Sequence, residues 1–178
     1  MVEKFAYDEK KAILITCSNY GTVEGVEPKW PELKDAPNQV DNYLDNFVLK
    51  FGFSRHNIHT LINPQEDDVD AIMDDLDGIS QTTSRKIAVF YIFVGYGVRQ
   101  KKDGTFHQTI LLPQADPDTK FYKMYPLELK IAQIALRQSN TYHFVLFDKY
   151  NDEGPLHDSN SILASKSVES TLSALSVA

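Results

Sequence analysis

The chain has 178 residues, of which 42% are hydrophobic and 24% are charged, and its formal net charge is −7. These values are typical of one globular domain with a core large enough to fold by itself. The negative charge argues against nucleic acid or an anionic membrane surface as the partner, because both attract basic faces. The chain contains no apolar run of about 18 residues and no apolar N-terminal segment of the signal-peptide kind, so we expect no membrane insertion.

Cysteine and histidine usage narrows the chemistry further. The single cysteine, Cys17, excludes an internal disulfide and a cysteine-based zinc site. It suits a reducing compartment, and we predict a cytoplasmic protein. No two histidines have the spacing of metal ligands, and no complete phosphate-binding glycine motif is present. We therefore expect neither a metal nor a cofactor.

The first half of the chain predicts two short strands, the first followed by a helix. Residues 12–16 have the length and composition of a buried strand, and residues 58–62 predict another. Asp35 is the expected N-cap of the intervening helix, with Pro37 in its first turn and Gly52 as its C-cap. The apolar stripe of this helix comprises Val40, Leu44, Phe47, Val48 and Phe51.

A second predicted helix carries an acidic cluster. Its inward stripe comprises Val69, Ile72, Met73, Leu76 and Ile79. Its other positions hold Asp67, Asp68, Asp70, Asp74, Asp75 and Asp77. Such a cluster is a possible cation site, but the spacing is not that of an EF-hand. A solvated helix face, with N-terminal acids favoured by the helix dipole, is the interpretation we prefer.

The central strand is predicted by residues 87–94, eight consecutive apolar residues that are mostly β-branched or aromatic. Such a run is typical of a strand buried on both faces, in a parallel or mixed sheet with helices above and below. Gly95-Tyr96-Gly97 follows, and its two glycines predict a sharp turn that presents Tyr96 at the carboxyl end of the strand. Because sites in open α/β sheets are built at that edge, Tyr96 is the first candidate site residue.

The second half predicts a hairpin, a third helix and a last core strand. The hairpin covers residues 98–112 and turns at Asp103-Gly104, a strong hairpin signal. Pro126 opens a helix, and residues 142–147 predict the last strand, which ends at Asp148-Lys149-Tyr150.

This element order predicts the fold class and its boundaries. Strands that alternate with helices indicate an α/β protein, here a three-layer α/β/α sandwich with a mainly parallel four-stranded core sheet plus a hairpin. We place this domain at residues 1–152. Residues 153–178 are rich in serine and predict a C-terminal tail, with one short helix at about residues 167–175.

Local patterns in this order resemble the caspase-like fold of metacaspases and paracaspases. The patterns are A-I-L-I-T-C-S-N-Y at 12–20, L-K-D-A-P-N-Q-V-D-N-Y-L at 33–44 with F-G-F at 51–53, F-V-G-Y-G at 93–97 and F-V-L-F-D-K-Y-N at 144–151. The likeness covers roughly residues 10–155. It implies that Tyr96 stands where the family has its catalytic histidine, in S-G-H-G. It also implies that Tyr150 stands where the family has its nucleophilic cysteine, in F-D-S-C.

The resemblance predicts a catalytically inactive domain. The family's reaction needs a thiolate to attack a peptide carbonyl and an imidazole to move protons near neutral pH. A phenol with an ordinary pKa of about 10 is a poor base at that pH, and Tyr96 and Tyr150 are bulky. In metacaspases the residue matching Asp148 helps to bind a basic substrate side chain, whereas Gln39 replaces the other expected acid. The strands that complete the family's binding groove have no obvious counterpart after Tyr150.

The expected function is therefore protein–protein contact, as a scaffold, a regulator or a structural subunit of a larger assembly. Two alternatives remain at this point. One is a residual or altered hydrolase in which Cys17 is a displaced nucleophile and His143 or His107 its base, although a buried cysteine more often acts as a small hydrophobe. The other is a small-ligand sensor that uses the former active-site cleft.

Overall fold

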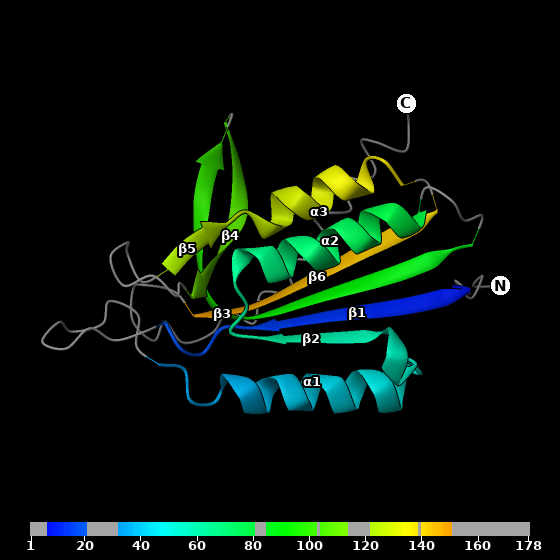
Figure 1. Ribbon diagram of the computed structural model, residues 1–178, viewed down its shortest axis with the longest axis horizontal. Helices are drawn as coiled ribbons and strands as arrows, with labels where there is room; N and C mark the ends of the chain where they lie inside the picture. Colours follow the sequence, from blue (N-terminus) through cyan, green and yellow to red (C-terminus); the bar gives the residue numbers. More distant parts are fainter. Residues whose placement is uncertain are drawn as a thin grey trace, which may run out of the picture.

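The computed structural model describes residues 7–20, 32–80, 85–102, 104–113, 122–138 and 140–150. Over these residues the chain is an α/β protein with six strands in one mixed, open sheet and three α-helices (Figure 1). The elements in chain order are β1 (Glu9–Thr16), α1 (Ala36–Phe51), the 3-10 turn η1 (Arg55–Asn57), β2 (Ile58–Ile62), α2 (Glu66–Ser80), β3 (Ile87–Lys102), β4 (Thr105–Pro113), β5 (Tyr122–Tyr125), α3 (Leu127–Ala135) and β6 (Thr141–Tyr150).

Four parallel strands form the core of the sheet. β1 pairs in parallel with β2 and β3, and β3 pairs in parallel with β6, which gives the order β2-β1-β3-β6. The far end of β3 pairs antiparallel with β4, and β4 pairs with β5. The predicted four-stranded parallel core and its hairpin are therefore confirmed, whereas β5 was not predicted.

Both faces of the central strands are covered. Residues on consecutive strand positions point to opposite faces of a sheet. The ring of Phe90 contacts the ring of Phe53, which follows α1, at a centroid distance of 5.4 Å. Tyr91, the next residue of β3, bonds His143 on the other face, where Gln138 after α3 contacts Leu76 of α2. We call these the α1 face and the α2–α3 face. Segments that follow α1 and α3 contact these two faces, and the long apolar run of β3 is buried except for the half-buried Phe90, as its composition predicts.

Gly95-Tyr96-Gly97 remains in the sheet, so the sharp turn predicted there is wrong. β3 runs through these residues and changes partner there: Tyr96 still pairs with β6, and Gly97 pairs with β4. β6 likewise continues to Tyr150. The reason is tertiary. The glycines alone favour a turn, but the pairing with β6 and then with β4 holds the segment extended.

The helix predictions are largely confirmed. α1 begins after Asp35 and ends before Gly52, whose φ of 67° is left-handed, although the Asp35 side chain makes no capping hydrogen bond. Phe51 was predicted to lie in the inward stripe, but its side chain is 58% exposed, while its carbonyl accepts a hydrogen bond from Lys10 of β1. The buried residues of α3 are Leu127, Ile131 and Ile134.

Two members of the acidic cluster are not simply solvated. Asp70 accepts hydrogen bonds from Tyr125 and Lys130, and these bonds hold the pKa of its carboxyl below the usual value. Asp77 forms an ion pair with Arg137. These contacts tie α2 to β5 and to α3.

Several predictions lie outside the described residues. They concern the serine-rich tail and its helix, and the side chains of Phe47, Val48 and Ile79. None of the helices in the described ranges is long and apolar enough to cross a membrane.

Candidate functional site

The sheet register brings Tyr96 and Tyr150 side by side. The two residues are the last partners in the parallel ladder between β3 and β6, at the carboxyl end of β6 and of the parallel part of β3. Neighbouring strands lie about 4.8 Å apart, so the backbones of these positions are adjacent. Two residues earlier on the same strands, Val94 pairs with Asp148, and Val94 also pairs with Thr16 of β1. The candidate residues at 96, 148 and 150 therefore share one edge of the sheet.

Tyr96 is buried at this edge by a second tyrosine. It is 7% exposed, and its ring meets that of Tyr20 edge to face, at a centroid distance of 5.1 Å. The backbone N–H of Tyr96 donates to the Tyr20 hydroxyl at 2.9 Å. The β1–β3 ladder ends at Thr16 and Val94. Beyond that pair, the Tyr20 hydroxyl accepts the Tyr96 N–H in place of a β1 carbonyl. Burial raises the pKa of Tyr20, so its hydroxyl stays protonated.

Gly95 allows this close approach. A Cβ atom at this position would lie 2.7 Å from Cζ of Phe93, 2.8 Å from the Tyr20 hydroxyl and 3.1 Å from the carbonyl oxygen of Cys17. Real Cβ atoms do not approach other atoms so closely. The glycine is therefore required because Tyr20 and the end of β1 pack directly onto the β3 backbone.

Cys17 is fully buried beneath the same contacts. Its exposed fraction is 0%, and its backbone N–H donates to the carbonyl of Val94 at 2.9 Å. Burial raises the pKa of its thiol, and a hydrogen bond with Tyr20 opposes this shift only in part. The thiol is therefore uncharged near neutral pH and is a poor nucleophile in this setting.

The two candidate bases lie at other levels of the sheet. His143 pairs with Val89, five residues before Val94, which is about 16 Å along the strand. His107 pairs with Gln100 in the β3–β4 hairpin. Neither histidine is at the level of Cys17.

The predicted pocket residues lie near each other and are linked by α1. Asp148 accepts a hydrogen bond of 2.9 Å from the hydroxyl of Tyr43. Tyr43 lies four residues after Gln39, so the two side chains leave the same side of α1. The structure thus places Gln39 and Asp148 in the same region of the α1 face. Sequence reasoning missed Tyr43, although its spacing from Gln39 was a usable signal.

Asn63 fixes the end of β1 and was also missed. Its φ of 48° is left-handed, a conformation that asparagine tolerates better than most residues. Its Oδ1 accepts from the backbone N–H groups of Ser18, at 2.8 Å, and Asn19, at 3.0 Å. Its own N–H donates to the carbonyl of Thr16 at 2.7 Å. The sequence indicated only that a strand ends at this asparagine.

Among the described side chains at this edge, Tyr20 packs on Tyr96, Asn63 accepts the N–H groups after β1, and the thiol of Cys17 is buried. In the ranges that the structure covers, no group of three or more His, Cys, Asp or Glu residues is placed to hold a metal ion. No protein-family model matches the chain, and a search of curated proteins finds no match.

Proposed function

We propose that this chain is a catalytically inactive caspase-like domain that works through protein–protein contact, as a scaffold or a structural subunit. One observation carries the proposal. Tyr96 and Tyr150, the positions that the resemblance equates with the catalytic histidine and cysteine, are partners on adjacent strands. A nucleophile and its base must be neighbours. The pairing supports the resemblance independently, because the two sequence motifs that contain Tyr96 and Tyr150 do not reveal which residues lie side by side.

The layering that we propose is the three-layer α/β/α sandwich of that fold. Support comes from the contacts of Phe90 and Tyr91, which place segments after α1 and α3 against opposite faces of the sheet. The strand order β2-β1-β3-β6, with connecting helices, agrees with this arrangement.

Loss of the reaction follows from the side chains at the edge. Tyr96 offers a phenol in place of an imidazole, and Tyr20 covers it. The buried, uncharged thiol of Cys17 argues against the alternative of a displaced cysteine nucleophile. A protein that keeps an intact core but none of this chemistry is best explained by selection for its shape.

β6 is the strand that we propose for protein contact. Within the described residues its one ladder partner is β3, so its other edge has no strand beside it. Open edges of this kind pair readily with other chains. Tyr142 and Phe144 on β6 are each 37% exposed, and partly exposed aromatic residues are common in interfaces. We propose a protein partner rather than nucleic acid, since the net charge is −7, and a reducing compartment such as the cytoplasm.

The test of inactivity is a peptidase assay on wild-type protein and on the double variant Tyr96→His, Tyr150→Cys. Fluorogenic peptides with Arg or Lys before the scissile bond are the substrates, and circular dichroism checks that each protein is folded. We expect no turnover from either protein, because Tyr20 still covers position 96 and the groove is incomplete. Efficient cleavage by the double variant would show that a working pocket persists. Cleavage by wild type that disappears in Cys17→Ser would establish the hydrolase instead.

A further inference from the structure

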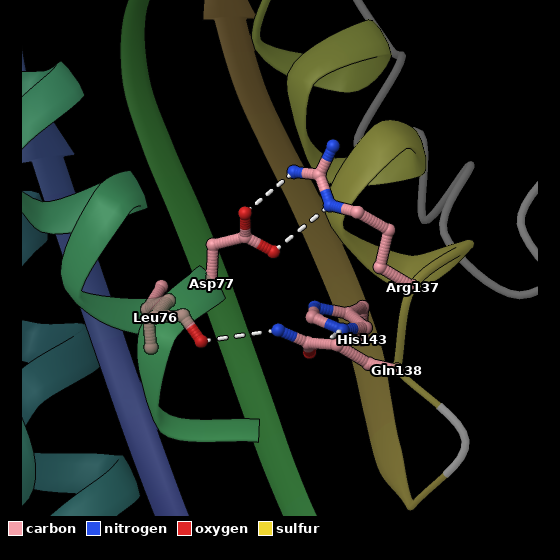
Figure 2. Close-up of polar contacts among 5 residues, drawn as sticks. All are labelled: Leu76, Asp77, Arg137, Gln138 and His143. Atoms are coloured by element: carbon pink, nitrogen blue, oxygen red, sulfur yellow. Dashed lines mark hydrogen bonds and ion pairs between the residues drawn. The ribbon is translucent and has the colours of Figure 1, made fainter. Parts of the chain in front are cut away.

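A buried chain of hydrogen bonds joins the sheet to the junction between α2 and α3. The Tyr91 hydroxyl on β3 lies 3.0 Å from Nδ1 of His143 on β6. Nε2 of His143 lies 3.0 Å from Oε1 of Gln138, and Nε2 of Gln138 donates to the carbonyl of Leu76 in α2 at 3.0 Å. The three side chains are 1%, 3% and 7% exposed, respectively. Figure 2 shows the outer part of this chain, from His143 to Leu76.

The partners fix the protonation state of His143. The Gln138 amide uses its N–H to donate to Leu76, so its oxygen must accept from Nε2–H of the imidazole. Nδ1 then accepts from the Tyr91 hydroxyl. Every group in the chain is satisfied only when the imidazole is neutral. A second ring proton would point at the Tyr91 oxygen and force the hydroxyl hydrogen away from Nδ1, its acceptor among the described residues.

The neighbouring charges do not help an imidazolium. Asp77 is the carboxylate beside this chain, and Arg137 already holds it through two bonds of 3.1 Å and 2.7 Å (Figure 2). Tyr91, the titratable residue that bonds the ring directly, is deeply buried and neutral. Burial accordingly lowers the pKa of His143 to about 4.

We propose that His143 is an acid-sensitive latch: the neutral ring holds the α2–α3 junction to the sheet, and protonation releases it. Consecutive residues act together at the junction, because Arg137 and Gln138 bond Asp77 and Leu76. Once the ring is charged, the ion pairs that still join α2 to the α3 segment among the described residues are Arg137–Asp77 and Lys130–Asp70. Both pairs are partly exposed, and each stabilises the junction only weakly by itself. The helices then separate from β6 while the β1–β3 pairing stays closed.

The direction and size of the effect follow from proton linkage. The open junction exposes His143 to water and binds a proton more readily than the closed one, so opening increases as the pH falls below about 6.5 and levels off near pH 4. With the closed-state pKa at about 4, the opening constant is about 30-fold larger at pH 5 than at pH 7.5.

Hydrogen–deuterium exchange of the full chain, corrected for the intrinsic rate at each pH, tests the latch. Peptides from residues 66–80 and 127–138 report the junction, and a peptide from β1 is the internal reference. We expect the 30-fold rise in junction opening at pH 5 in wild type and in His59→Gln, which changes an exposed histidine on β2. His143→Gln should abolish the rise, because a glutamine does not titrate.

A second variant covers the case in which His143→Gln does not fold. Gln138→Glu places a carboxylate against Nε2–H, which favours the charged ring and should flatten or reverse the pH dependence. A junction that opens equally at both pH values in wild type would overturn the proposal. An equal rise in the β1 peptide, or a full rise in His143→Gln, would overturn it as well.

Discussion

Replacing Gly95 by alanine tests the packing at the carboxyl edge of the sheet most sharply. The new Cβ would lie within 3.0 Å of both the Phe93 ring and the Tyr20 hydroxyl. Phe93 is 0% exposed and Tyr20 is 2% exposed, so neither side chain can swing into solvent. The third close atom, the carbonyl oxygen of Cys17, belongs to backbone that is bonded to Val94.

The expected loss of stability follows from two opposing effects. Adding a methyl group to a well-packed site costs about 1–3 kcal/mol, and three close contacts place Gly95→Ala in the upper part of that range. Alanine restricts the unfolded chain more than glycine does, which returns about 0.4–1 kcal/mol. We therefore expect the free energy of unfolding to fall by about 1–2 kcal/mol.

Urea unfolding followed by far-ultraviolet circular dichroism measures this change. The matched control is Gly78→Ala in α2, where a Cβ would meet nothing within 4 Å. That variant should gain about 0.5–1 kcal/mol, because alanine suits a helix interior better than glycine. Tyr20→Phe removes one of the atoms that the new Cβ would approach. The double variant Gly95→Ala, Tyr20→Phe should therefore lose less free energy of unfolding than the two single variants lose together. If Gly95→Ala is as stable as wild type, the close packing of Tyr20 on β3 is not real.

Three further experiments probe the same edge. A thiol reagent should label Cys17 much more slowly in native protein than in urea, since burial disfavours the thiolate, and equal rates would contradict that burial. Asn63→Ala should lower the free energy of unfolding in urea by roughly 1–3 kcal/mol, because two backbone N–H groups lose their acceptor. Asn63→Asp keeps the acceptor and should lower it less. Equal losses in the two variants would refute the acceptor role. Tyr43→Phe should lower the free energy of unfolding by about 1 kcal/mol, because the hydrogen bond to Asp148 is lost. An unchanged free energy of unfolding would show that this bond does not stabilise the protein.

Local signals in the sequence were sufficient for most of the fold. The ends of α1 were predictable because Pro37 and Gly52 act within one turn of each boundary. β2 was predicted with the bounds that the structure shows, since a short segment rich in β-branched residues and closed by Asn63-Pro64 is a local pattern. The β3–β4 hairpin followed from Asp103-Gly104 in the same way.

Features decided by distant partners were not predictable in this way. Gly95 and Tyr96 stay extended because they pair with β6, a strand more than 40 residues away in the sequence, whereas Gly97 pairs with β4 of the predicted hairpin. β5 is only four residues long and depends on its pairing with β4. At the candidate site, motifs identified Tyr96, Tyr150 and Asp148, but the roles of Tyr20, Tyr43 and Asn63 depend on contacts between segments far apart in the chain.

The most direct test of the proposed scaffold role is the native mass of the protein in extract from cells that make it, by size-exclusion chromatography with immunodetection. Purified recombinant protein on the same column gives the elution position of the isolated 178-residue chain. We predict that the native protein elutes well ahead of that position, in a complex whose other members mass spectrometry can name. Elution of the native protein together with the isolated chain would contradict a role as a scaffold or structural subunit.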